Sequence, residues 1–237
     1  MEPRRTLSAV VLLLLVLASA ASAQQHDKRF EVGLVARADK VSVEAGVKQV
    51  MPVFGAAAAW HFSKVWAVEG EVTQAGGGEF ARSYEGTSIS YAPPGASYAE
   101  LERLAVRERW RNGYQPGVGF SVAATAQGNL TTRVDLKVRL GISGRTYKET
   151  SAQTVLQIPE GIDPARVSAS LFNGNGLSGS QTSNTQRGGL LMGIEVPIRV
   201  AHRLAVAPDL RYVYGGPAEI GYKHNELSLG MRASVAF

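Results

Sequence analysis

The sequence contains no cysteine, which excludes disulfide bonds and thiolate metal sites. Beyond residue 23 it also lacks an apolar run of the ~20 residues that a membrane-spanning helix needs. Any membrane-spanning part of the remaining chain must therefore be a closed β-barrel, because only helices and closed barrels satisfy every backbone hydrogen bond in hydrocarbon. Lysine and arginine form no block of the kind that nucleic-acid binding calls for.

The first 23 residues have the pattern of a secretory signal peptide. Arg4 and Arg5 precede an apolar core at residues 7–18, and the small residues 21–23 form a cleavage site. We expect export and a mature chain that starts at Gln24. An uncleaved membrane anchor is the alternative interpretation, since the apolar run is almost long enough to span a bilayer.

Eight segments alternate between apolar and small or polar residues with a period of two, which predicts strands. In the clearest of them Val138, Leu140 and Ile142 alternate with Lys137, Arg139 and Gly141. Most segments have the ~9–11 residues that a tilted strand needs to cross a bilayer. The eight segments are residues 29–38, 53–62, 65–73, 114–127, 133–142, 190–200, 204–214 and 226–237.

The connections between these segments alternate in length. Short ones at 63–64, 127–129 and 201–203 separate longer ones at 39–52, 74–113, 144–188 and 215–225. Short turns on one rim and long loops on the other are typical of outer-membrane barrels. A soluble barrel or sandwich would show the same alternation with the apolar side inward. The polar side is rich in Gly, Ala and Ser, however, which suits a narrow barrel interior better than a surface in water.

Aromatic residues gather at the ends of the predicted strands. Trp60, Phe62 and Trp66 flank the short connection at 63–64, whereas Tyr212 and Tyr214 stand at a long-loop end. Two such groups predict the aromatic girdles of the two membrane interfaces. We therefore predict an all-β protein with one domain at 24–237, an eight-stranded antiparallel up-and-down transmembrane β-barrel.

The last segment is apolar at alternate positions and ends the chain on an aromatic residue. Its characteristic residues are Leu227, Leu229, Gly230, Val235 and Phe237. With residues 65–71, this segment resembles the small OmpA/OmpX-like outer-membrane β-barrels, and the resemblance covers residues 24–237. It implies a location in the cell outer membrane and contact with outer-membrane lipids and lipopolysaccharide, and it indicates the architecture but not an activity. It also implies periplasmic chaperones and a barrel assembly machinery that recognises the terminal segment as its signal.

Charged residues of both signs lie on the polar side of the strands. Since buried charges must be paired, we expect an ionic network that fills the narrow interior. A narrow or gated pore for small solutes is the alternative. The predicted network comprises Glu69, Glu71, Arg133, Asp135, Lys137, Arg139, Glu195, Arg199, Asp209, Arg211 and Arg232, and Glu31 and Arg37 share their side.

His61 and Ser63, with Glu71 downstream, resemble the His-x-Ser pair and acidic partner of the outer-membrane lipid A deacylases. A Ser–His–carboxylate set activates a hydroxyl as nucleophile, so a lipid A-modifying hydrolase is the second alternative. Ser63 falls in a short turn, however, and Glu71 is roughly 25 Å away along an extended strand. The histidines show no metal-ligand spacing, and we expect no metal and no cofactor.

The long connections are the expected functional surface. Residues 100–111 suit either a strand that prolongs the barrel or one helical turn, and residues 173–183 suggest a flexible segment. Arg103, Arg107, Arg109 and Arg111 could contact lipopolysaccharide phosphates, or could be solvated and paired with Glu100, Glu102 and Glu108. The leading hypothesis is a non-enzymatic envelope or surface-recognition protein whose extracellular ligand the sequence leaves open.

Overall fold

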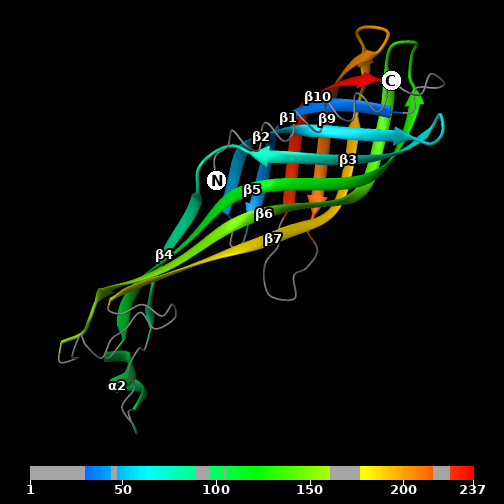
Figure 1. Cartoon of the computed structure of the whole chain (residues 1–237). Coiled ribbons are helices and arrows are strands. Elements are labelled where there is room, and N and C mark those ends of the chain that lie inside the picture. The colour runs from blue at the N-terminus through cyan, green and yellow to red at the C-terminus, as the bar shows by residue number, and fades with distance from the viewer. Residues whose placement is uncertain are drawn as a thin grey trace. The chain divides into compact units, whose positions relative to one another are not determined.

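The computed structural model describes residues 30–43, 47–88, 95, 97–103, 105–160, 177–215 and 225–237. The predicted signal peptide at 1–23 lies outside these residues. Among them, no helix is long and apolar enough to cross a membrane. The elements are β1 (Phe30–Val43), β2 (Val47–His61), β3 (Trp66–Ala75), β4 (Phe80–Ser88), α2 (Tyr98–Arg103), β5 (Val106–Asn129), β6 (Asp135–Gln157), β7 (Ser178–Glu195), β8 (Ile198–Arg199), β9 (Leu204–Tyr214) and β10 (Asn225–Ala236) (Figure 1).

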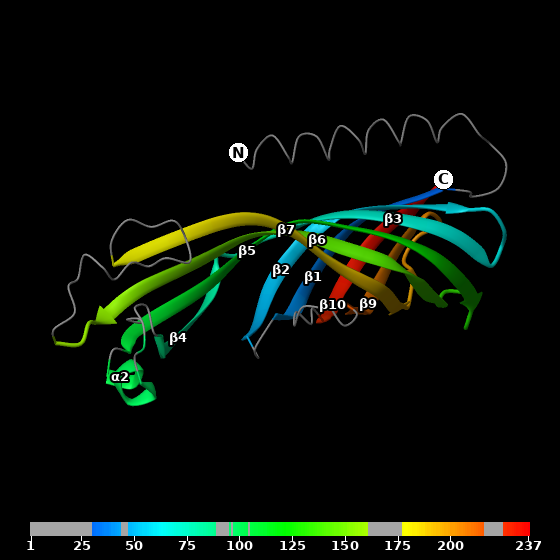
Figure 2. The same cartoon turned by 90° about the horizontal axis from the view of Figure 1, so that it is seen from below.

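Eight strands form a closed ring in the order β10, β1, β2, β3, β5, β6, β7, β9, and β9 pairs back to β10. The final strand closes the ring, since β10 is antiparallel to β1 on one edge and to β9 on the other. Figure 2 shows β2, β1, β10 and β9 in succession. The fold is thus the predicted all-β, up-and-down barrel of eight strands.

The chain divides into two compact units. We call the described parts of residues 30–77, 117–146 and 186–237 the barrel, and those of 78–116 and 147–185 the extension. The strands β5, β6 and β7 contribute residues to both units.

The wall of the barrel is apolar outside and charged inside. Along β3 exposed and buried residues alternate without interruption. Trp66, Val68 and Val72 are exposed, whereas Glu69 and Glu71 are buried. A soluble protein rarely exposes so large an apolar surface, so the medium around the ring is hydrocarbon. The soluble β-barrel or sandwich, with its apolar side inward, is therefore excluded.

Three short turns share one rim of the barrel and one hydrogen-bond pattern. In each turn the first backbone N–H donates to a carbonyl four residues later. Ser63 and Thr131 add side-chain oxygens that accept backbone N–H groups within their turns. The three turn-closing bonds join Phe62 to Trp66 (3.2 Å), Leu130 to Val134 (2.9 Å) and Val200 to Leu204 (3.0 Å).

Small residues on the inner side leave room for long charged side chains. A Cβ on Gly193 would lie 2.9 Å from Cγ of Arg139, and one on Gly33 would lie 3.0 Å from Nε of Arg232. Both arginines are fully buried. The glycine-rich polar side predicted from the sequence therefore serves to accommodate arginine in a narrow interior.

The predicted strand ends were wrong at the rim opposite the short turns. The expected long connection at 39–52 is instead a hairpin, because β1 continues to Val43 and pairs with β2 from Val47. Much of the expected loops at 74–113 and 144–188 is strand as well. The flexible interpretation of 173–183 fails from Ser178 onward, where β7 begins; residues 173–176 lie outside the described part.

The extension is an antiparallel sheet with a small core of its own. Its strand β4 pairs with the first half of β5, from Phe80 opposite Tyr114 to Ser88 opposite Val106. The rings of Phe80 and Tyr114 stack with centroids 5.5 Å apart. Val106 and Val155 are buried against each other and against Ile158.

The stretch 100–111, for which the sequence left two possibilities, contains both a helical turn and a strand. The helix α2 begins after Ser97, whose N–H and hydroxyl both donate to Glu100 at 2.8 Å. The backbone N–H of Glu100 donates in return to the Ser97 hydroxyl at 3.4 Å. This reciprocal arrangement is a capping box, and it explains why the helix starts there. The hydrogen bonds that the backbone N–H and the hydroxyl of Ser97 donate also lower the pKa of Glu100 from its ordinary value. The strand β5 follows from Val106.

Candidate functional site

The barrel interior holds an ionic network that begins around Glu69. This carboxylate accepts a hydrogen bond from Arg232 at 2.5 Å and lies 3.3 Å from a guanidinium nitrogen of Arg139. Arg139 also donates to Glu195 and, at 2.7 Å, to Asp209. These residues come from five strands of the ring, β3, β6, β7, β9 and β10. The network therefore ties together strands that are far apart in sequence.

A second group of charges continues the network within the barrel. Arg37 donates to Glu71 and, at 2.8 Å, to Asp39. Arg145 donates to Asp39 at 2.6 Å and lies 3.5 Å from Glu226. Arg211 connects the two groups, since it lies 2.7 Å from Glu71 of the second group and donates at 2.5 Å to Asp209 of the first.

The near balance of the two signs makes burial of this network possible. Moving one ion out of water costs several kcal/mol, and only close opposite charges offset that cost. Arg139 and Arg232 have no exposed side-chain surface. Side chains of this length fill the interior of an eight-stranded ring, which is too narrow for a wide channel.

Of the eleven predicted network residues, nine are buried and two are not. Arg199 lies near the short-turn rim, where its side chain is 46% exposed and donates to Asp135 at 2.8 Å. Arg133 is exposed in the turn that precedes β6. It is outside the network because Thr131 closes that turn by accepting the backbone N–H of Arg133. The nine buried residues are Glu69, Glu71, Asp135, Lys137, Arg139, Glu195, Asp209, Arg211 and Arg232.

Three buried charged residues of the barrel, Asp39, Arg145 and Glu226, were not predicted from the sequence. Asp39 and Arg145 fell in segments taken for loops, and Glu226 stood at the first position of the terminal segment. In each case the residue lies two or more positions along the strand from another inward-facing residue, at the same alternate spacing. Asp39, for example, follows Arg37 by two residues, and both side chains face the barrel interior. A rule that extends parity beyond the last apolar residue would have found them.

The residues of the hydrolase alternative do not come together. Ser63 is exposed, and its hydroxyl oxygen accepts the backbone N–H groups of Val65 and Trp66 at 3.2 and 2.9 Å. His61 lies 3.4 Å from Glu31 through its Nε2. Glu71 is occupied by Arg37 and Arg211. The hydroxyl thus serves the turn and has neither base nor acid beside it among these contacts.

Aromatic side chains lie at both ends of the barrel strands. Trp60, Phe62 and Trp66 are exposed around the short turn, and the rings of the first two are 6.1 Å apart. Tyr214 is exposed at the far end of β9, and Tyr212 is partly buried beside it.

The terminal segment is built into the ring. Leu227 and Leu229 are exposed, whereas Gly230 lies opposite Arg37 in β1 and Val235 opposite Val32. The backbone N–H of Phe237 donates to the carbonyl of Phe30 at 2.8 Å. The last residue of the chain is therefore held against the first residue of β1.

A row of arginines lies along the extension on β5. Arg107 and Arg109 both bond to Glu85 of β4, at 2.7 and 2.6 Å, and Arg111 lies 3.1 Å from Glu79. The predicted partner Glu108 is buried, because adjacent strand residues point to opposite sides. Arg103 is exposed on α2. Hydrogen bonds from Arg109 and Arg107 lower the pKa of Glu85.

The part of β7 in the extension has one unoccupied edge. Its neighbours in the sheet are β6 and β9, but pairing with β9 begins only at Leu190. Within the described part of the chain, no strand pairs with the other edge of residues 178–185. Residues 178–186 carry no charged side chain and no proline. Proteins commonly protect an exposed edge with such residues.

Among the described residues, no group of three or more His, Asp or Glu side chains is arranged to hold a metal ion. The chain matches no family model, and no curated protein matches it either.

Several solved structures are similar to the chain. They include Ail, the attachment invasion locus protein of Yersinia pestis, with sucrose octasulfate (14% identity, TM-score 0.43, 87% of this chain and 97% of that chain). The N-terminal β-barrel domain of Pseudomonas aeruginosa OprF is 9% identical (TM-score 0.41, 86% and 96%). Neisserial surface protein A is 15% identical (TM-score 0.41, 90% and 100%). These are small outer-membrane β-barrels, and this chain has their architecture by its own closed ring, apolar belt and charged interior.

Proposed function

We propose that this outer-membrane barrel is a non-enzymatic protein that presents the extension at the cell surface as a recognition surface. In this proposal residues 1–23 are a signal peptide, and periplasmic chaperones and the barrel assembly machinery receive the mature chain. Leu227, Leu229, Gly230, Val235 and Phe237 serve as the assembly signal. Trp60, Phe62, Trp66, Tyr212 and Tyr214 anchor the barrel at the two interfaces and contact outer-membrane lipids and lipopolysaccharide.

The observation that carries the proposal is the edge of β7 with which no strand of the described residues pairs. An exposed edge offers backbone N–H and C=O groups that an extended segment of another protein can pair with. The exposed side chains beside them, Gln181 to Asn184, supply further hydrogen-bonding groups without charge. The edge of β4 differs, because Arg82 and Glu85 stand on it. We therefore assign protein recognition by strand addition to the β7 edge.

The experiment adds positive charge to one edge at a time. The double variant Thr182→Lys, Asn184→Lys places two charges on the β7 edge, and Ser83→Lys, Thr87→Lys does the same on β4. The barrel in lipid nanodiscs is screened against a displayed library of short random peptides. We expect selected peptides to bind wild type and the β4 variant and to lose binding to the β7 variant. Equal binding to all three proteins, or a library that yields no binder, would overturn the proposal.

The interior network argues against the pore alternative. Arg139 and Arg232 are fully buried among carboxylates, so a solute would have to displace paired charges. We expect no steady conductance above background in planar bilayers. Stepwise conductance that Arg139→Met changes would instead make the interior the functional site.

A further inference from the structure

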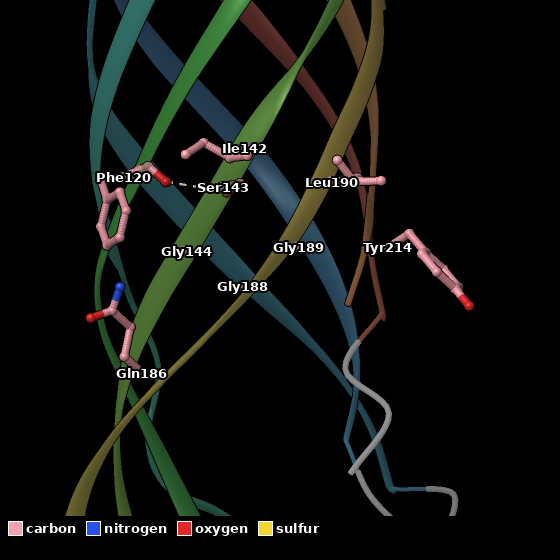
Figure 3. Close-up of a pocket in the computed structure, with 9 residues that line it drawn as sticks. All are labelled: Phe120, Ile142, Ser143, Gly144, Gln186, Gly188, Gly189, Leu190 and Tyr214. Carbon is pink, nitrogen blue, oxygen red and sulfur yellow. Dashed lines mark hydrogen bonds between the residues drawn. The ribbon is translucent and has the colours of Figure 1, made fainter. Parts of the chain in front are cut away.

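The outer wall of the barrel contains an apolar hollow at the point where β7 parts from β9 (Figure 3). Its volume is about 440 Å³, which is within the range of ligand pockets. Phe120 stands on one side of it and Tyr214 on the other, with Ile142 and Leu190 between them.

Glycine forms the floor of the hollow, and the packing requires glycine there. A Cβ on Gly188 would lie 2.3 Å from the carbonyl oxygen of Ser143, and one on Gly189 would lie 2.0 Å from that of Tyr214. No other residue fits these positions without moving a neighbouring strand. The hollow is therefore a fixed feature of the wall and cannot be filled by a side chain from its own floor.

The chemistry of the lining is amphipathic. Phe120, Ile142, Leu190 and Tyr214 are all more than one third exposed and face the hydrocarbon around the barrel. The Ser143 hydroxyl is already engaged, since it donates to the carbonyl of Phe120 at 3.2 Å. Gln186 is exposed at one end of the hollow and brings an amide to it. This combination suits an acyl chain that ends in an ester or amide linkage.

We propose that the hollow binds one acyl chain of lipid A, with Gln186 hydrogen-bonded to the linkage at the head of that chain. The choice of lipid rests on the proposed function. In an outer-membrane barrel with an extracellular recognition surface, the short turns lie at the periplasmic side and the opposite rim faces the cell exterior. Tyr214 is at the opposite end of β9 from the turn at 200–203, so the hollow faces the outer leaflet. Since lipid already surrounds the wall, binding comes from close packing and hydrogen bonding and not from the hydrophobic effect.

The test counts lipids that stay bound to the purified barrel. The protein in detergent is titrated with lipid A and analysed by native mass spectrometry. Leu190→Trp and Ile142→Trp fill the hollow from two sides. Leu34→Trp adds the same bulk on β1, which is three strands from β7 and four strands from β6 in the ring. We expect each filling variant to weaken lipid A binding about fivefold or more, roughly 1 kcal/mol. Leu34→Trp should bind like wild type, and Gln186→Ala should fall between them.

Three results would overturn the inference. Folding of the filling variants is checked by the change of gel mobility in SDS between unboiled and boiled samples. Filling variants that show the wild-type change but bind lipid A as tightly as wild type would show that the hollow is not the site. Phosphatidylethanolamine that binds as tightly as lipid A would remove the assignment to the outer-leaflet lipid. A wild-type dimer that Leu190→Trp converts to monomer would make the hollow a contact between copies. None of these results bears on peptide binding at the β7 edge, so the two proposals fail separately.

Discussion

The barrel and the extension use the same strands with opposite polarity. On β5 the exposed residues are Val118, Phe120 and Val122 in the barrel, but Arg107 and Arg109 in the extension. The alternation of side chains has the same period in both units. Only the medium differs, because hydrocarbon surrounds one unit and water the other.

The buried residues show the same inversion. The barrel buries Lys137 and Arg139 on β6, whereas the extension buries Val155 on that strand against Val106. A charged interior is possible in the barrel because a closed ring supplies partners from every side. The described part of the extension forms no closed ring. It packs Val106 and Val155 as a small apolar core, and it also buries one charged side chain, Glu108. The barrel is therefore suited to anchoring and the extension to contact with molecules in water.

The largest expected effect comes from removing one cation of the interior. Arg232→Met leaves Glu69, Glu31 and Glu195 short of a partner in a buried site. Removing one member of a buried ion pair costs about 3–5 kcal/mol. We expect a lower urea midpoint in bilayers and partial loss of the mobility shift on boiling.

The matched control for this prediction is Arg111→Met in the extension, where the side chain is 52% exposed. It should leave the barrel transition unchanged. Adding Glu69→Gln to Arg232→Met should recover part of the loss, because it removes a charge that has lost its partner. An Arg232→Met barrel with the wild-type midpoint would show that the network does not hold the ring together.

A second prediction compares the same Leu→Arg substitution at two positions of β6, one in the barrel and one in the extension. Leu140 is 60% exposed in the barrel belt and Leu156 is 39% exposed in the extension. Leu140→Arg should destabilise the protein by about 2–4 kcal/mol, since the new charge faces the bilayer interior. Leu156→Arg faces water and should stay within about 0.5 kcal/mol. Equal midpoints in urea-induced unfolding from bilayers would contradict the assignment of the two media.

The alternation in the sequence was sufficient to predict the ring, because membrane-facing strands must be apolar on one side throughout. It failed where the strands leave the membrane. The strand expected at 133–142 lies in β6 from Asp135 onward, and β6 continues to Gln157, 15 residues beyond the expected end. The strand β4 was predicted as loop. In water a strand no longer needs an apolar side, so the signal stops before the strand does.

The interior charges were also predictable from the alternation with apolar residues, and only as far along each strand as those apolar residues continue. The alternation identified Glu69 and Arg139 because apolar residues of the opposite side lie next to them in the sequence. It could not identify Arg145, which follows the last apolar residue of its segment, and it wrongly included Arg133 in a turn. The hollow was invisible, since it depends on how closely Gly188 approaches a neighbouring strand.

A smaller effect should follow from Val106→Ala in the extension core. The change removes two buried carbon atoms, or about 1–2 kcal/mol of local stability. We expect faster amide hydrogen exchange in β4 and the first half of β5, with the barrel strands unchanged. Val122→Ala on the same strand is the control, because Val122 is 51% exposed to lipid. Faster exchange throughout both units would mean that the extension has no independent core.

The smallest effect concerns pH and Glu85. Hydrogen bonds from Arg109 and Arg107 lower its pKa below the ordinary 4.5. Because the folded-state pKa is the lower one, the stabilisation is present above pH 4.5 and is lost as the pH falls through the folded value. Amide exchange in β4 should therefore rise modestly on acidification, after correction for intrinsic rates. Glu85→Gln should remove this dependence, whereas Glu160→Gln, on an exposed residue outside the strands, should keep it. If amide exchange rose in the barrel strands at a higher pH than in β4, the enclosed network would be less stable to acid than the extension, which would contradict this prediction.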